Sequence, residues 1–367
     1  MKEKIKKIIK SPVFTIVLVV SLTGLVLWLT LRNDFDQVVE MIRNANVWIL
    51  LFIVGLMICD RIIHGWGLMK ECNVACPQYK WSQGFVNSYT GSLFNNITPS
   101  ASGGQFAQLY IFTRQGVPVS NAIGVLWLDF IIYQTTMSIF VLLLLILRFG
   151  YYFSHYSQFF IIVLFGFMVN TAVILALWAM VRFPRFYHWL STSGINIGAR
   201  LHLIKDKEKT KKKIEEQLNR FEKEVVVLKN HKKMILKIGL SNLLRLTIYY
   251  SVPYFCALAL HIPITFDKML DVLALSSFVA MVNAFVPLPG SSGGTEASFI
   301  LMFSTLFNRI DVSSIMILWR VMTYYFQTLM GGLVFLYGKT RPIVLNDNIQ
   351  LMPGDEKPVN SSADDVK

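Results

Sequence analysis

The sequence predicts an all-α polytopic membrane protein: an inverted-topology repeat with six full transmembrane helices and two re-entrant helical hairpins. Composition is the first reason, because 54% of the 367 residues are hydrophobic and only 16% are charged. Soluble domains carry about 25% charged residues. The mean hydropathy of +0.51 agrees, and apolar runs such as 12–31 exceed the roughly 18 residues that cross a bilayer. These features exclude an ordinary soluble domain.

The distribution of basic residues predicts the topology. Six apolar runs are expected to span the membrane: 12–31, 47–69, 119–147, 158–181, 234–260 and 314–338. Lys and Arg collect on the cytoplasmic side, so the basic start, the loop 182–233 and the pair Lys339 and Arg341 should share that side. Six crossings allow this only if each of the segments 81–116 and 269–308 leaves the membrane on the side from which it enters. We therefore expect two re-entrant hairpins and cytoplasmic N- and C-termini in a multi-pass protein of the cell membrane.

An internal repeat supports this topology. The segment 94–107 matches 284–297. Further along the chain, Gln134 and Thr135 correspond to Gln327 and Thr328. The predicted units, about 47–147 and 234–338, then have opposite orientations in the membrane. Short Gly-rich segments can also match by chance. Inverted repeats with broken helices are typical of transporters, whose binding sites lie near the bilayer midplane.

The matching segments contain the candidate site. Proline and glycine end a helix there, and the next half-helix begins with free N–H groups and a positive dipole end that attract an anion such as a lipid phosphate. The candidate head-group ligands in the two hairpins are Pro99, Ser102, Gly103, Gly104, Gln105, Pro289, Gly290, Ser292, Gly293, Gly294, Thr295 and Glu296. The alternative is that these are kinks capped by serine and packed through small residues.

Ionisable residues inside predicted spans are expensive and therefore candidates for function. Arg245, Arg320 and Tyr324 are predicted to bind the head group, and Glu296 either fixes an arginine or carries a proton. Asp129, Asp60 and Arg61 are possible ion-pair or proton-linked residues. The alternative is that all of these form structural ion pairs.

Other regions suggest contacts but no chemistry. We expect no cofactor and no catalytic residues, because the sequence has no Ser-His-Asp arrangement, P-loop, GxGxxG motif or His-rich metal pattern. We expect no metal site, because Cys72 and Cys76 lack further ligands that would complete a zinc pattern. The basic stretch 205–233 is predicted to be an amphipathic helix on the anionic membrane surface. Its apolar face, and the lack of an RNA-binding motif, argue against nucleic acid as a partner. The tail 345–367 reads as disordered.

Three stretches carry a family resemblance: FNNITPSASGGQFAQLYIFTRQG (94–116), VPLPGSSGGTEASF (286–299) and LWRVMTYYFQTLMGG (318–332). Together they resemble the lysylphosphatidylglycerol synthase transmembrane (flippase-like) family, the membrane domain of multiple peptide resistance factor proteins, in its Gram-positive branch. The resemblance implies a flippase-like transmembrane domain over 1–340 without the C-terminal aminoacyltransferase domain. Many relatives have an acidic residue and an arginine where this chain has Gln105 and Gln108, so the substrate is not carried over.

Three functions follow as hypotheses. The leading one is a lipid translocator that moves an anionic or aminoacylated phospholipid, or a glycolipid, between leaflets. The second is an enzyme of the phosphatidylglycerol lysyltransferase type, as the family name implies. The third is a non-transporting membrane partner of a separate lipid synthase or glycosyltransferase, with 182–233 as its docking surface.

Overall fold

The computed structural model describes residues 35–98, 101–147, 164, 167–168, 171–172, 174–175, 231–283, 286, 288 and 290–340. Several predictions fall outside this part of the chain. They concern the first span at 12–31, most of the span at 158–181, nearly all of the basic loop 182–233, the tail 345–367, and the two prolines Pro99 and Pro289.

Every described element is a helix. The α-helices are α3 (Phe35–Arg43), α4 (Val47–Cys72), α5 (Trp81–Ile97), α6 (Gly104–Arg114), α7 (Val119–Leu147), α12 (Lys232–Ala259), α13 (Met269–Asn283), α14 (Gly294–Phe303), α15 (Arg309–Arg320) and α16 (Phe326–Thr340). A short 3-10 helix, η1 (Phe266–Lys268), precedes α13, and a π-helical turn, η2 (Val321–Tyr325), joins α15 to α16. Of the described helices, α4 and α7 are long and apolar enough to cross a membrane. The all-α prediction is confirmed, and the count of six spans stays a prediction.

The chain breaks its helices where the sequence predicts. α5 and α6 are separated by 98–103, and α13 and α14 by 284–293. In each case the two helices pack against each other. At the second break Gly290 and Gly293 have positive φ, as does Ser291, which is a conformation that glycine adopts without steric cost. These helix pairs have the form expected for hairpins, while their depth in a membrane stays a prediction.

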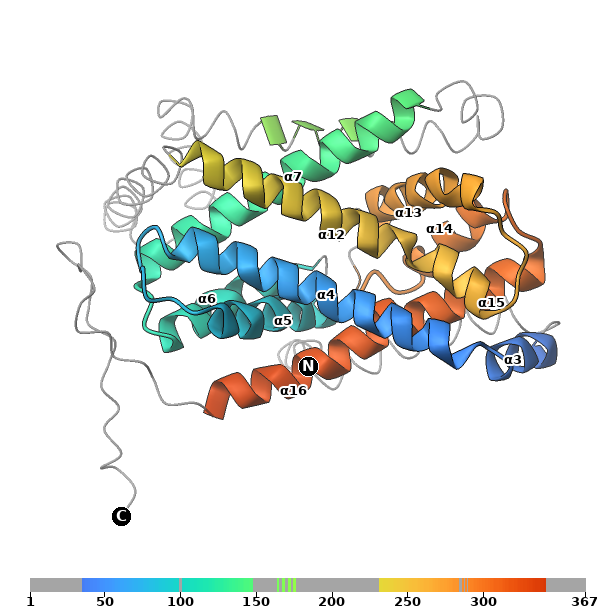
Figure 1. Cartoon of the computed structure of the whole chain (residues 1–367), viewed down its shortest axis with the longest axis horizontal. Helices are drawn as coiled ribbons and strands as arrows, with labels where there is room; N and C mark the ends of the chain where they lie inside the picture. Colours follow the sequence, from blue (N-terminus) through green and yellow to red (C-terminus); the bar gives the residue numbers. More distant parts are fainter. Residues whose placement is uncertain are drawn as a thin grey trace, which may run out of the picture.

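The longest helices come from different parts of the chain and lie side by side. α4 and α12 run antiparallel through the middle of the molecule (Figure 1). The Asn46 N–H, just before α4, donates to the Ala259 carbonyl at the end of α12 over 2.8 Å. α5 packs along α16, while α7 packs on α12 and α13. Helices from the first half of the chain are therefore interleaved with helices from the second half.

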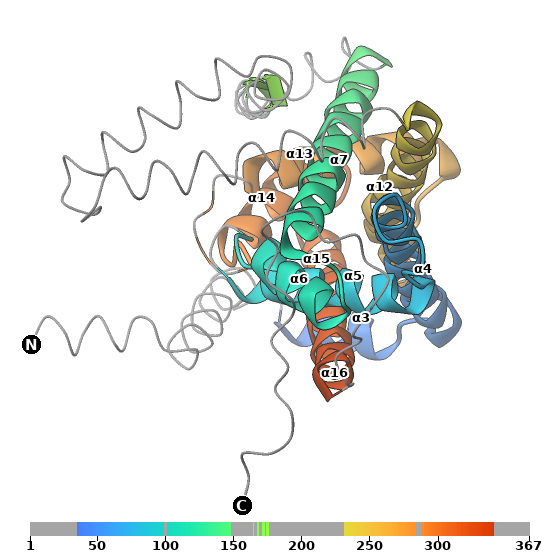
Figure 2. The ribbon, with the colours of Figure 1, turned by 90° about the vertical axis from the view of Figure 1, so that its left-hand side faces the viewer.

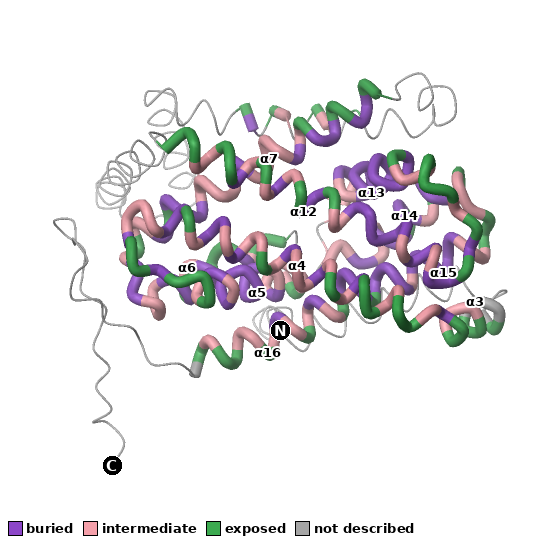
Figure 3. Tube along the Cα trace, viewed as in Figure 1, coloured by how far each residue is buried: buried purple, intermediate pink, exposed green. Residues whose placement is uncertain are grey.

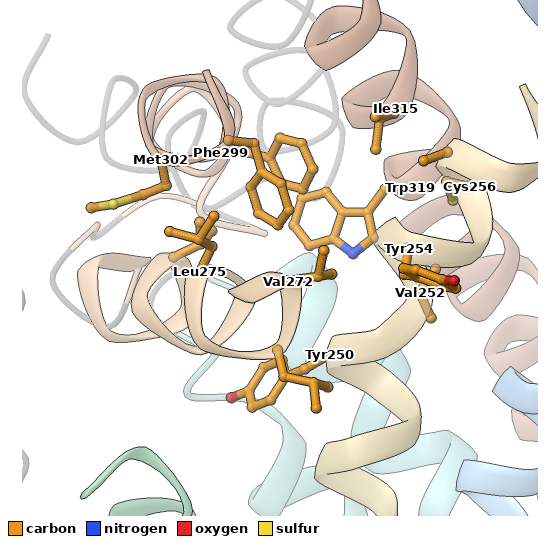
Figure 4. Packing of buried hydrophobic residues seen from close by; sticks show 14 of the residues in the cluster. Tyr250, Val252, Tyr254, Cys256, Val272, Leu275, Phe299, Met302, Ile315 and Trp319 are labelled. Carbon is orange, nitrogen blue, oxygen red and sulfur yellow. The ribbon is translucent and has the colours of Figure 1, made fainter. Parts of the chain in front are cut away.

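Aromatic packing fixes α14 against α15. The rings of Phe299 and Phe303 stack with centroids 4.2 Å apart, and Phe299 also stacks on Trp319 at 4.7 Å. Figure 4 shows Phe299 and Trp319 in the centre of this buried cluster. Because Glu296 lies three residues before Phe299 and Arg320 directly follows Trp319, this stack also holds these two charged residues in register.

Apolar side chains also cover much of the outer surface. Along α7 the outward positions are exposed (Figure 3), among them Ile139, Leu142, Leu143 and Ile146. Such a contiguous apolar face would be unusual on a soluble monomer. It is what a helix in contact with lipid requires.

The contact between α4 and α5 provides a stability test. A Cβ on Gly65 would lie 2.7 Å from the backbone N and Cα of Phe85, whereas a Cβ on Gly55 of the same helix meets nothing within 4 Å. We expect Gly65→Ala to lower the thermal unfolding temperature in detergent by several degrees, because two backbones would have to move apart. Gly55→Ala should leave that temperature equal or slightly higher, since alanine favours helix by about 1 kcal/mol over glycine. Equal unfolding temperatures for both variants would contradict this packing.

Candidate functional site

A polar cavity of about 610 Å³ lies inside the helix bundle. It is bounded by α4, α5, α6, α7, α12 and the η2–α16 region, and by the first helix break. The lining includes charged and polar side chains: Asp60, Arg61, His64, Asn95, Asn96, Ser102, Gln105, Gln108, Asp129, Tyr133, Gln134, Arg245, Tyr249, Thr323 and Gln327. A polar cavity of this kind in a chain so apolar is the most distinctive feature of the described structure.

Asp60 holds two arginines at one wall of the large cavity. Its Oδ1 accepts from Arg245 Nε at 3.0 Å, and its Oδ2 accepts from Arg61 Nε at 2.6 Å. Arg245 Nη1 also donates to Asn242 Oδ1 at 2.8 Å. Asp60 and Arg245 are 2% and 7% exposed, respectively. Because two guanidinium groups share one carboxylate here, this wall carries one positive charge more than Asp60 balances.

His64 links a second carboxylate to the same cavity. Its Nε2 lies 3.2 Å from Asp129 Oδ2, and its Nδ1 lies 2.9 Å from Ser88 Oγ. These residues stand on α4, α7 and α5, so the imidazole ties three helices together. Asp129 supplies a second negative charge to the cavity lining, so two carboxylates and two arginines of the lining balance when His64 is neutral.

Glu296 and Arg320 form the charged pair of the second helix break. Arg320 Nε donates to Glu296 Oε1 at 2.8 Å, and Nη2 lies 2.7 Å from the same oxygen. Nη2 also donates to the Gly290 carbonyl at 3.2 Å. The Arg320 Cζ lies 4.6 Å from the centroid of the Tyr324 ring. Glu296 is completely buried. The pair therefore joins α14, the break and α15 through one guanidinium.

A smaller cavity of about 170 Å³ adjoins this second pair. Five residues line both cavities: Asn95, Asn96, Ala101, Tyr249 and Thr323. Tyr324 Oη donates to the Asn96 carbonyl at 3.2 Å, and Asn96 Nδ2 donates to Thr328 Oγ1 at 3.0 Å. The two helix breaks thus meet, and only a shared layer of residues separates the two cavities.

The helix N-termini at the breaks differ from the sequence expectation. We expected free N–H groups, but Gly103 N donates to Thr98 Oγ1 at 2.8 Å and Gly104 N donates to Asn95 Oδ1 at 3.0 Å. At the second break Gly293 N donates to Glu296 Oε2 at 2.7 Å. Side chains thus satisfy donors that have no partner within their own helix. The groups that remain available at the breaks are therefore arginine and amide side chains more than bare backbone.

The structure brings many of the predicted residues together and separates others. Ser102 and Gln105 face the large cavity with Asp60, Arg61, Asp129 and Arg245. Gly290, Thr295, Arg320 and Tyr324 line the small one. Gly294 packs on Val286, and Ser292 is fully buried outside both linings, its hydroxyl without a hydrogen-bond partner. Ser292 and Gly294, like Gly103 and Gly104, therefore shape the breaks and do not face a cavity.

Sequence reasoning missed several lining residues. Asn95 and Asn96 are not among the predicted ligands, although two adjacent amide side chains in an apolar helix could have indicated a polar site. Tyr249 and Thr323 resemble ordinary residues of a packed helix and gave no signal. Gln134 and Gln327 were noticed as repeat partners but not as ligands, and both line the large cavity.

This arrangement suits the binding of a charged polar group in a water-poor space. Arginine presents forked donors that match phosphate oxygens, and carboxylates, amides and hydroxyls stand within the same cavity. In the described part of the chain no group of three or more His, Cys, Asp and Glu side chains is placed to hold a metal ion.

The apolar helices and exterior, with the buried polar centre, define an all-helical integral membrane protein. Residues 14–331 match the family model for the lysylphosphatidylglycerol synthase TM region. Because this match covers most of the 367 residues, the chain belongs to that family, and its function is related to membrane lipid. No curated protein matches the chain.

The Glu296–Arg320 pair generates a stability prediction. Glu296→Gln or Arg320→Gln alone should lower the free energy of unfolding by about 3–5 kcal/mol, because each leaves a buried charge unpaired. The double variant should recover part of this loss, since neither charge then remains. Denaturant unfolding of the four proteins in detergent micelles gives the coupling energy. Strictly additive losses in the double variant would show that the two residues do not act as a pair.

Proposed function

We propose that this protein is a lipid translocator, which moves the head group of an anionic or aminoacylated phospholipid, or of a glycolipid, across the cell membrane. The observation that carries the proposal is the cavity of about 610 Å³ between apolar helices, which has charged residues in its lining. Its size lies in the range of small-molecule sites, roughly 300–1,000 Å³. Charged residues cost about 2.5–3.5 kcal/mol each at the bilayer centre on insertion scales, so a cluster of them implies a use.

The packing of the helices supports an inverted repeat. α7 of the first unit packs on α12 and α13 of the second, while η2 and α16 of the second unit pack on α4 and α5 of the first. These contacts are reciprocal, as a pseudo-twofold axis would require. In the proposed topology the chain crosses the membrane six times, and the pairs α5–α6 and α13–α14 are the re-entrant hairpins.

The charges at the ends of the bundle support the proposed orientation. One end carries the basic residues Lys70, Lys80, Arg114, Lys232, Lys233, Lys237 and Lys339, together with the buried Glu71. The opposite end mixes signs, with Asp36, Glu40, Arg43, Asp267, Lys268, Asp271, Arg309 and Asp311. By the positive-inside rule the first end, on the left in Figure 1, faces the cytoplasm.

The mechanism follows from the two adjoining cavities. When a head group enters the large cavity, its phosphate replaces Asp60 in part as the partner of Arg61 and Arg245. The acyl chains of the lipid stay in the membrane. Movement past the shared layer at Asn96 and Thr323 brings it to Arg320 in the small cavity. The Tyr324–Asn96 hydrogen bond closes the passage between them. The π-helical turn η2 carries Thr323 and Tyr324, and π-helical turns are common at functional sites.

Obstruction of the cavity tests this function. Gln105 lines the large cavity, whereas Phe106, next to it on α6, is 75% exposed and lines neither of the two cavities. In proteoliposomes with head-group-labelled phosphatidylglycerol, lysyl-phosphatidylglycerol or a diglucosyl lipid, Gln105→Trp should slow translocation about tenfold or more, because the indole fills the path. Phe106→Trp should stay within about twofold of the unmodified protein.

The other outcomes separate the alternatives. Equal rates for the two variants would remove the cavity from the path. If folded protein moves no lipid, a non-transporting partner of a separate lipid synthase becomes the better account. Formation of lysyl-phosphatidylglycerol from lysyl-tRNA and phosphatidylglycerol by the purified chain would instead establish the lysyltransferase activity.

A further inference from the structure

His64 lines the large cavity but has no task in the proposed translocation path. Its Nδ1 lies 2.9 Å from Ser88 Oγ on α5, and its Nε2 lies 3.2 Å from Asp129 Oδ2 on α7. Both helices pack against α4, as the view from the end of the bundle shows (Figure 2). Only 12% of the His64 side chain is exposed. Because histidine changes its charge near neutral pH, this position can take up and release a proton inside the bundle.

The two contacts of the imidazole fix where a proton is gained. An ionised carboxylate only accepts hydrogen bonds, so Nε2, which faces Asp129, carries the hydrogen of the neutral ring. Nδ1 is then the acceptor for the Ser88 hydroxyl. A second proton binds at Nδ1, and the Ser88 hydroxyl turns to accept it, because a hydroxyl both donates and accepts. The two partners therefore suit the charged ring as well as the neutral one.

Charged groups from three helices surround the imidazole. The charged and titratable side chains of the described lining, besides His64, are Asp60 and Arg61 on α4, Asp129 and Tyr133 on α7, and Arg245 and Tyr249 on α12. The lining residues from α5, α6 and the η2–α16 region are uncharged. Asp129 favours a proton on His64, whereas the arginines and burial oppose it. The ring is therefore held neutral while both arginines are available to act on it.

A second titratable group shares this face of α4. Glu71 lies seven residues after His64, which is about two helical turns. It is completely buried, does not line the large cavity, and neither of its carboxyl oxygens has a hydrogen-bond partner. Any assignment of a proton to His64 must therefore be tested against Glu71.

A phosphate in the large cavity changes the charge balance around His64. With the ring neutral, Asp60 and Asp129 balance Arg61 and Arg245 among the described lining residues, so a phosphate adds one negative charge without an offset. The phosphate also pairs with the arginines and weakens their opposition to a proton on the imidazole. Both effects favour proton uptake, and by linkage the proton strengthens phosphate binding to the same extent.

We propose that the large cavity binds an anionic phospholipid head group together with one proton, which His64 carries at Nδ1. The N–H bond forms with a proton from water when the phosphate enters, and it breaks when the phosphate leaves. The inference rests on the proposed translocation and deepens it, because lipid and proton then cross in the same direction and a proton gradient drives the movement. It also selects a head group with a phosphate and no cation of its own among the possible substrates.

The test measures proton uptake when a ligand binds to the purified full chain in detergent micelles, with a pH indicator in weakly buffered solution. The ligands are phosphatidylglycerol, a diglucosyl lipid without phosphate, and glycerophosphoglycerol, which is the same head group without acyl chains. His64→Gln removes the titratable ring and keeps an amide that forms hydrogen bonds. His261→Gln is the matched control, because His261 is exposed and lines neither cavity. Glu71→Gln removes the other titratable group.

We expect phosphatidylglycerol binding to take up about one proton per lipid. Because the complex holds one proton more than the free protein, raising the pH weakens binding. The dissociation constant should rise about tenfold per pH unit where the free ring is neutral and the bound ring is charged. His261→Gln and Glu71→Gln should keep this dependence, and His64→Gln should lose it. The diglucosyl lipid should take up no proton, since it brings no negative charge.

Several results would overturn the proposal: no proton uptake by the unmodified protein, uptake that persists in His64→Gln, uptake that Glu71→Gln abolishes, or equal affinity for glycerophosphoglycerol and the lipid. If His64→Gln does not fold, Ser88→Ala replaces it, because loss of the Nδ1 partner should move the end of proton uptake to lower pH. An unchanged uptake curve in Ser88→Ala would then contradict the account.

This assay requires no transport, so its result stands apart from the proteoliposome assay. Lipid movement without proton uptake on binding would leave the translocation in place and overturn the coupling. Proton uptake on binding without lipid movement would support the phosphate and proton site and remove the translocation.

Discussion

Pairing of buried charge is the constraint on which the rest of this structure depends. Glu296 is completely buried and Arg320 is nearly so, and neither is tolerable alone in a water-poor interior. Their contact, together with the Gly290 carbonyl and the Gly293 N–H, fixes how α14 begins and where α15 lies beside it. Asp60 does the same between α4 and α12 through Arg245. Each pair joins helices that hydrophobic contact alone would leave free to slide.

The same constraint explains why the cavities are where they are. Charges that must be paired also need polar surroundings, and amides and hydroxyls from several helices converge on them. Helices then cannot close completely over the polar groups, and space remains at the breaks. At the first break the side chains of Asn95 and Thr98 accept hydrogen bonds from backbone N–H groups at the start of α6. At the second break the Glu296 carboxylate accepts the corresponding bond. The two breaks have related positions but different chemistry, and only the second depends on a charge.

Much of the fold could be predicted from the sequence, because apolar length and the Pro-Gly segments are local signals. Such signals predict a helix break within 94–107, another within 284–297, and functional charges at Asp60, Arg245, Glu296 and Arg320. Which charges pair could not be predicted, since Arg245 meets Asp60 from a position 185 residues away. The capping of Gly103 by Thr98 and of Gly104 by Asn95 is local in sequence, but it depends on how the chain turns between α5 and α6, which the residue pattern does not specify. Neutral lining residues such as Tyr249 and Thr323 differ from core residues only through their three-dimensional neighbours.

The central claim is that the large and the small cavity form one path for a head group between the two faces of the membrane. Gln105→Cys, in a background where Cys59, Cys72, Cys76 and Cys256 are replaced, provides the direct measurement. A membrane-impermeant thiol reagent applied to one side of oriented vesicles, and then to the other, should label position 105 from both sides, with lipid substrate slowing both reactions. Labelling from one side alone, under every lipid condition, would contradict the account, because a path for a head group must open to both leaflets.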